Sequence, residues 1–128
     1  MKIMTLVTTI LLVTASSLVF AEKRLTKTEA NDLFSGMTVH YEVVKKGLKV
    51  VAYFDPSGEA REMRGNTPDN HPWWVEDDGR HCIKFAGKKK ASCMYVTKRD
   101  DGTYAKYNKK GKLRVQYNSF EEGNTNGL

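Results

Sequence analysis

Hydrophobic and polar positions alternate along most of the chain, in short runs that turn residues separate. Val39, Tyr41 and Val43 occupy every second position of one run, and residues 48–54 continue the pattern. Alternation with a period of two is typical of strands that bury one face. The spacing predicts eight strands, at residues 38–44, 48–54, 59–64, 73–76, 81–85, 92–97, 103–107 and 113–120.

The turns between these runs indicate how the strands are connected. Asp55-Pro-Ser-Gly58 combines a proline, which fixes φ, with a glycine that accepts positive φ. Most other connections are equally short, and we expect only residues 65–70 to form a long loop. Short strands joined in this way must pair or close so that no edge stays open. We therefore predict a mainly β fold, an antiparallel barrel-like meander, with a two-sheet β-sandwich as the alternative.

A short helix precedes the predicted strands. Thr26 and Glu29 have the spacing of a capping box, in which each side chain binds the other residue's backbone amide. Leu33 and Phe34 continue an apolar face, and Gly36 ends the helix. A helix of this length is not stable alone, so we expect it to pack across one open end of the barrel.

The first residues have the pattern of an export signal. Lys2 precedes an apolar segment, residues 3–13, and small residues lead to a cleavage site after Ala21. An uncleaved membrane anchor is the alternative. No second apolar run follows, so we expect no membrane span in the mature chain. The prediction is a signal peptide (residues 1–21), one β domain (22–120) and a flexible tail (121–128), located in the periplasm or secreted.

Cys82 and Cys93 are the only cysteines. An even number of cysteines in an exported chain favours a structural disulfide. A hairpin that turns at residues 87–88 sets the two cysteines opposite each other, within bonding range. The other pairs in this register are Ile83 with Ser92 and Phe85 with Lys90.

The segment His71-Pro-Trp-Trp-Val-Glu-Asp-Asp-Gly-Arg-His-Cys82 holds many reactive side chains, but their spacing does not indicate catalysis. Its acids surround a turn glycine, where acids are favoured for backbone reasons. No two histidines have the spacing of metal ligands, and no nucleophile motif is present in the chain. We therefore predict no enzyme activity, no catalytic residue, no metal site and no cofactor.

Charge is distributed unevenly along the sequence. The formal net charge is +6, with −5 on residues 54–79 and +10 on residues 80–114. Lys88, Lys89 and Lys90 belong to the basic part. Lysine-rich turns keep β edges soluble, and this is the explanation we favour. The alternative is an anionic partner, such as an acidic envelope protein, an envelope polymer or lipid head groups. An exported protein seldom meets nucleic acid, so we do not expect nucleic acid as a partner.

Trp73 and Trp74 are adjacent on a predicted strand, so their side chains point to opposite faces. One is expected in the core, and the other is either covered or an aromatic anchor at a binding surface. Arg80 and His81 are further candidates for contact with a partner.

Several short motifs occur in a familiar order. They are Leu33-Phe-Ser-Gly-Met-Thr38, Tyr53-Phe-Asp-Pro-Ser-Gly58, Trp74 before Cys82, Cys93, and Gly102-Thr-Tyr104. With these motifs the chain resembles a family of small exported proteobacterial β proteins of unknown function. The chain departs from that family in its lysine-rich half and its tryptophan pair. The resemblance implies a periplasmic location and the β fold, and it implies no activity.

These observations favour a non-catalytic periplasmic or secreted binding protein with a disulfide-braced β surface. One alternative is an inhibitor or immunity protein against a periplasmic hydrolase or toxin, because charge asymmetry speeds association with such an enzyme. A second alternative is a carrier of a small apolar ligand, which requires an open barrel with a cavity.

Overall fold

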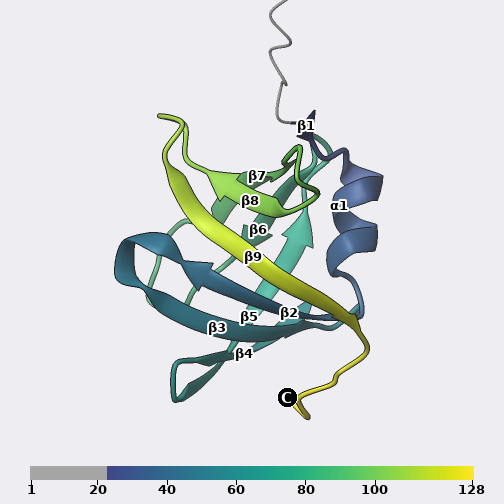
Figure 1. The fold of residues 1–128 in the computed structure, drawn as a ribbon. Coiled ribbons are helices and arrows are strands. Elements are labelled where there is room, and N and C mark those ends of the chain that lie inside the picture. Colours follow the sequence, from purple (N-terminus) through teal and green to yellow (C-terminus); the bar gives the residue numbers. More distant parts are fainter. Residues whose placement is uncertain (1–22) are drawn as a thin grey trace, which may run out of the picture.

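A computed structural model describes residues 23–128 of the chain. The predicted signal peptide lies outside the described residues. Within them, eight antiparallel strands close into a barrel, which Figure 1 shows with one additional short strand. The barrel strands are β2 (Met37–Val43), β3 (Leu48–Phe54), β4 (Glu59–Arg64), β5 (Thr67–Val75), β6 (Arg80–Ile83), β7 (Ser92–Lys98), β8 (Tyr104–Tyr107) and β9 (Leu113–Glu122).

The barrel is an up-and-down meander. Each strand pairs with its neighbours in the sequence, and β9 closes the barrel by pairing with β2. A short 3₁₀ helix, η1 (Val44–Lys46), connects β2 to β3. The predicted mainly β meander is therefore confirmed, in its barrel form and not as a sandwich.

Helix α1 (Lys27–Phe34) precedes the barrel and packs across one end of it (Figure 1). Its capping box is present: the Glu29 amide donates to Oγ1 of Thr26 at 3.2 Å, and the Thr26 amide donates to the Glu29 carboxylate at 3.1 Å. Phe34 is fully buried and meets the ring of Phe54 edge-on, with centroids 5.2 Å apart. The helix thus closes this end of the barrel, as predicted. Among the described residues, no helix is long and apolar enough to cross a membrane.

The turn between β5 and β6 lies directly against the start of α1. Lys27 Nζ binds the Asp77 carboxylate at 2.7 Å. Gly79 has φ +92°, and a Cβ at this position would collide with the backbone carbonyl oxygen of Leu25. Only glycine permits this contact, so the turn fixes the position of the helix on the barrel.

The alternation seen in the sequence places one face of each strand inside the barrel. The buried apolar residues of these inward faces are Val39, Tyr41, Val50, Ala52, Phe54, Ala60, Trp73, Ile83, Val96, Val115 and Tyr117. The acidic and basic side chains of Glu62, His71, His81 and Lys106 are also buried. Their presence in the interior is the feature that distinguishes this barrel from one filled only by apolar residues.

The prediction of a long loop at residues 65–70 is wrong. Arg64 pairs with Thr67 across a tight turn, and β5 then continues through Pro68 and Pro72. Prolines are tolerated because β6 pairs only with Trp73–Val75 of β5. The first half of β5 therefore has a strand on one side only, and a proline can direct its missing N–H away from that strand.

The connection between β6 and β7 is longer than predicted. Cys82 pairs with Cys93 and Ile83 with Ser92, as predicted. However, β6 ends at Ile83, so the expected pair of Phe85 with Lys90 does not form. Residues 84–91 make an irregular loop at the end of the barrel opposite α1.

The sheet includes residues before and after the predicted strands. The strand β1 (Lys23–Arg24), which the sequence pattern did not indicate, pairs with Lys98 and Thr97 of β7. At the other end, β9 runs to residue 122, so the predicted tail begins within a strand. Thr38 Oγ1 donates to the Gly123 carbonyl at 2.6 Å and fixes the backbone just after that strand.

Candidate functional site

A cavity of about 500 Å³ occupies the barrel interior at the end away from α1. Phe54 lies at its inner end, in contact with Phe34 of the helix. Lys46, Lys88 and Lys90 contribute to its lining and are exposed. The cavity therefore reaches solvent between η1 and the 84–91 loop, while the helix closes the opposite end of the barrel.

The lining of this cavity is part apolar and part basic. The apolar lining residues are Val43, Phe54, Ile83, Phe85, Met94 and Val115. The basic lining residues are Lys46, Arg64, Lys88, Lys90, Lys106 and Arg114. Asp69 is the one acidic side chain in this lining. Basic side chains around a low-dielectric cavity concentrate positive potential there, so the interior favours a negatively charged group over a positively charged one.

Lys106 and His81 form a buried polar pair in the cavity wall. Lys106 Nζ lies 2.7 Å from Nδ1 of His81 and 3.5 Å from its carbonyl oxygen. The imidazole of His81 stacks on Phe34, with ring centroids 3.9 Å apart. A protonated lysine can only donate, so when Lys106 carries its charge Nδ1 is the acceptor and the neutral imidazole carries its proton on Nε2. This Nε2 is buried and has no hydrogen-bond partner among the described residues.

Burial determines the protonation of this pair. Removal from water lowers the pKa of Lys106 from 10.5 to about 7, although the negative charge of Glu62 raises it in part. Burial, together with the nearby charge of Lys106, holds the pKa of His81 well below 6.5. His81 is therefore neutral at pH 7, and Lys106 changes its charge close to that pH.

Glu62 is the acidic centre of the interior. Its carboxylate accepts a hydrogen bond from the Tyr41 hydroxyl at 2.8 Å and one from Arg64 at 3.1 Å. Nε2 of His71 lies 3.3 Å from a Glu62 oxygen and 3.3 Å from an Asp69 oxygen, without hydrogen-bond alignment to either. The Glu62 carboxylate is thus already compensated by an arginine and a phenol of this chain.

The same carboxylate affects both interior tyrosines. Burial, then the charge of Glu62, raise the pKa of Tyr41 well above 10. Tyr117 has its pKa raised for the same two reasons. Both phenols are therefore neutral hydrogen-bonding groups in the cavity wall and do not act as bases near neutral pH.

The two tryptophans take separate positions, as predicted. Trp73 is buried in the core, and its indole N–H donates to the Asp55 carbonyl at 2.9 Å. Trp74 points to the outer face, where 36% of it is exposed, and its N–H donates to Glu76 at 3.1 Å. Of the pair, only Trp74 is placed to contact a partner in solution.

The other predicted contact residues are not one site. Arg80 is half-buried and pairs with Asp78 at 2.8 Å on the outside, whereas His81 is fully buried inside the barrel. Lys88 and Lys90 line the cavity, and Lys89, between them, is exposed and outside the lining. His81, Lys88 and Lys90 therefore share the cavity, while Arg80 and Lys89 do not.

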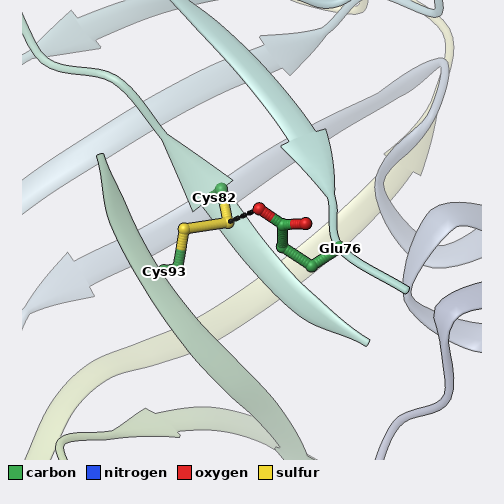
Figure 2. Close-up of side chains that lie close together, drawn as sticks. All are labelled: Glu76, Cys82 and Cys93. Atoms are coloured by element: carbon green, nitrogen blue, oxygen red, sulfur yellow. Dashed lines mark hydrogen bonds between the residues drawn. A yellow bond between two sulfur atoms is a disulfide. The ribbon is translucent and has the colours of Figure 1, made fainter. Parts of the chain in front are cut away.

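The predicted disulfide is present between Cys82 and Cys93, whose Cα atoms are 4.1 Å apart. Figure 2 shows the bond with Glu76 beside it, where a carboxylate oxygen lies 4.0 Å from Cys82 Sγ. A sulfur in a disulfide has no hydrogen to donate, so this approach is a packing contact. Although these three side chains lie within 4.8 Å of one another, the sulfurs are bonded together and are not thiolate metal ligands.

The prediction from sequence missed the polar residues of the interior, namely Glu62, His71, Lys106 and Arg114. One signal for His81 was present. Cys82 bonds to Cys93 on the outer face, and adjacent strand residues point to opposite faces, so His81 has to point inward. No comparable marker distinguishes Lys106 from the other lysines of the basic half.

Searches of protein-family models, curated proteins and solved structures found no match to this chain.

Proposed function

We propose that the chain is an exported, non-catalytic binding protein whose barrel interior takes up a small molecule. The observation that carries this proposal is the cavity of about 500 Å³ that reaches solvent at one end. Small-molecule sites in proteins typically measure about 300–1,000 Å³ and combine apolar walls with a few polar groups. The lining fits this description in both respects.

The proposal makes the carrier hypothesis more specific. A carrier of a purely apolar ligand requires an apolar interior, whereas this cavity contains Lys106, His81 and Arg114 beside its apolar residues. The ligand that fits has both an apolar part and a polar group. The tyrosines and the neutral His81 supply hydrogen bonds that orient such a molecule.

The proposed location is the periplasm. A disulfide between Cys82 and Cys93 is typical of proteins that fold in an oxidising compartment. The predicted signal peptide supports the same location, with secretion from the cell as the alternative. Membership in the family of small exported β proteins, which the sequence motifs indicate, is part of the same proposal.

An inhibitor or immunity protein is the second candidate, and Trp74 is the observation that favours it. Its indole is exposed beside an acidic turn, and its N–H is fixed on Glu76. A rigid exposed tryptophan is a common anchor in protein interfaces. If this candidate is right, the wild-type protein retains one hydrolase from an envelope extract, and Trp74→Ala does not.

Titration with a neutral, environment-sensitive dye such as Nile red tests the principal proposal. Wild-type protein should enhance its fluorescence in a saturable manner with one site per chain. Ser92→Trp, which places a large side chain in the cavity wall, should abolish the enhancement. Lys49→Trp on the outside of β3 is the matched control and should bind the dye like the wild type. Equal binding by both variants, with native circular dichroism, would contradict an interior site.

A further inference from the structure

Lys106 is a buried cation without an anionic partner. It is 3% exposed, and among the described residues its Nζ has polar contacts only with the ring nitrogen and the carbonyl oxygen of His81. No carboxylate of the described residues lies within ion-pair distance of it. A buried ammonium group is costly unless an anion compensates it. When Lys106 is protonated, the wall of the cavity therefore contains a positive charge that no carboxylate of the described residues neutralises by direct contact.

His81 adds a second polar group that lacks a hydrogen-bond partner, next to Lys106. Its Nδ1 is engaged by Lys106, and its Nε2 is buried with no partner among the described residues. In the tautomer that this contact selects, Nε2 is a hydrogen-bond donor. Lys106 and His81 thus present donors to the cavity, and what they lack is an acceptor.

Glu62 does not supply that acceptor. Its carboxylate is held by Tyr41 and Arg64, and it influences Lys106 through charge at a distance and not through a contact. A ligand with a positive charge would meet Lys106 and Arg114, for which the described residues supply no carboxylate partner. The charges of the cavity therefore discriminate against cations and favour an anion.

The mouth of the cavity has the same preference. Lys46 projects from η1, Lys88 and Lys90 from the 84–91 loop, and Arg114 from the start of β9. These basic groups lie on three separate segments that meet around the opening, with Asp69 as the only acid in the lining. Such an arrangement draws an anion toward the opening and raises its association rate.

We propose that the ligand is a small amphipathic carboxylate, whose anionic group binds Lys106 while its hydrocarbon part packs against the apolar wall. This inference rests on the proposed binding function and specifies the ligand class for the same cavity. The apolar side chains that receive the hydrocarbon are Val43, Ile83, Met94 and Val115. The carboxylate supplies the charge that Lys106 lacks and an acceptor for His81 Nε2.

The test compares decanoate with decanol, which share a hydrocarbon chain and differ in charge. Binding of each is measured by displacement of Nile red and by calorimetry, at a pH of about 6, where Lys106 is mostly protonated. We expect decanoate to bind at least tenfold more tightly than decanol. Lys106→Met should remove this preference for the carboxylate over the alcohol. Lys89→Met, an exposed lysine outside the lining, is the control and should behave like the wild type.

The possible outcomes distinguish the binding function of the cavity from the carboxylate specificity of its ligand. Equal binding of decanoate and decanol, unaffected by Lys106→Met, overturns the carboxylate inference and leaves the binding function intact. Binding of neither compound, together with no dye binding by wild-type protein, overturns both. Loss of dye binding by Ser92→Trp together with a preference for decanoate supports both.

If Lys106→Met fails to fold, the pH titration of Lys106 in the wild-type protein tests the same inference. The groups around Lys106 that also titrate or carry charge are His81 on β6, Glu62 on β4, Tyr41 on β2 and Tyr117 on β9. Lysine side-chain NMR signals, followed as a function of pH, report Lys106 directly. Bound decanoate should raise its pKa, and decanol should not. An unchanged Lys106 titration in saturating decanoate overturns the inference.

Discussion

Lys106 Nζ and His81 Nδ1 lie 2.7 Å apart inside the barrel, on strands that are separated by β7. The contact joins two groups that both become cations on protonation. At this distance and burial, two positive charges cannot coexist without an anion, so the pair holds at most one proton beyond the neutral state. The charge of the cavity wall therefore changes near neutral pH, as Lys106 gains or loses its proton.

The unliganded protein should become more stable as pH rises from about 7 to about 9. Lys106 has its pKa lowered to about 7 in the folded state, while the unfolded chain keeps the ordinary value of 10.5. Between these values the unfolded state binds a proton that the folded state does not, so the free energy of unfolding increases with pH. Urea denaturation across this range measures the slope. Lys106→Met should remove it and Lys89→Met should not; identical slopes in all three proteins would contradict the assignment.

Glu62→Gln should lower the pKa of Tyr41, Tyr117 and Lys106 together. The negative charge of Glu62 raises all three, since it stabilises the protonated lysine and opposes ionisation of the phenols. Phenolate absorbance at alkaline pH follows the tyrosines, and lysine NMR signals follow Lys106. Glu42→Gln is the control because Glu42 lies on the outward face of β2. Tyrosine titrations that do not move in Glu62→Gln would contradict this electrostatic coupling.

The double substitution Cys82→Ala and Cys93→Ala should reduce the free energy of unfolding by about 3 kcal/mol, according to the chain-entropy model for a loop of this length. The cysteines are 11 residues apart and join β6 to β7 on the outer face. Denaturant titration measures the loss. Affinity for decanoate should change little because the bond does not line the cavity. An unchanged free energy of unfolding would mean that the bond does not restrict the unfolded chain as the model assumes.

Gly79→Ala should be far more destabilising than Gly87→Ala. Both glycines have positive φ, +92° and +76°, so both substitutions carry a backbone strain of about 1–2 kcal/mol. At Gly87 the added Cβ has no neighbour within 4 Å, whereas at Gly79 it meets the Leu25 carbonyl. The difference between the two variants in denaturation experiments thus measures the docking of α1 on the β5–β6 turn. Equal losses would indicate that the helix moves away at little cost.

The scaffold was largely predictable from sequence because local chemistry determines it. The capping box of Thr26 and Glu29, the alternation in β3 and the opposed cysteines each depend on a few neighbouring residues. The hairpin at residues 64–67 was missed because Pro68 normally argues against a strand. Pro68 is tolerated in β5 because this part of the strand has a partner on one side only, and that is a property of the whole sheet.

The interior polar residues were not predictable in the same way. In β4, polar residues occupy both faces, with Arg61 outward and Glu62 inward, so alternation does not identify the buried one. Lys106 occurs among many exposed lysines, and only its register against Val96 and Val115 places it inside. The candidate site therefore arises from closure of the barrel, which brings β4, β6 and β8 together around one cavity.

The location of bound decanoate shows whether the ligand enters the barrel interior. Nuclear Overhauser effects between the ligand's methylene protons and protein methyl groups identify the residues that it touches. We expect such effects to Ile83 and Val115, which line the cavity, and none to Val51, which alternates with the inward residues of β3. Effects confined to Val51 and other outward methyl groups would contradict an interior binding site.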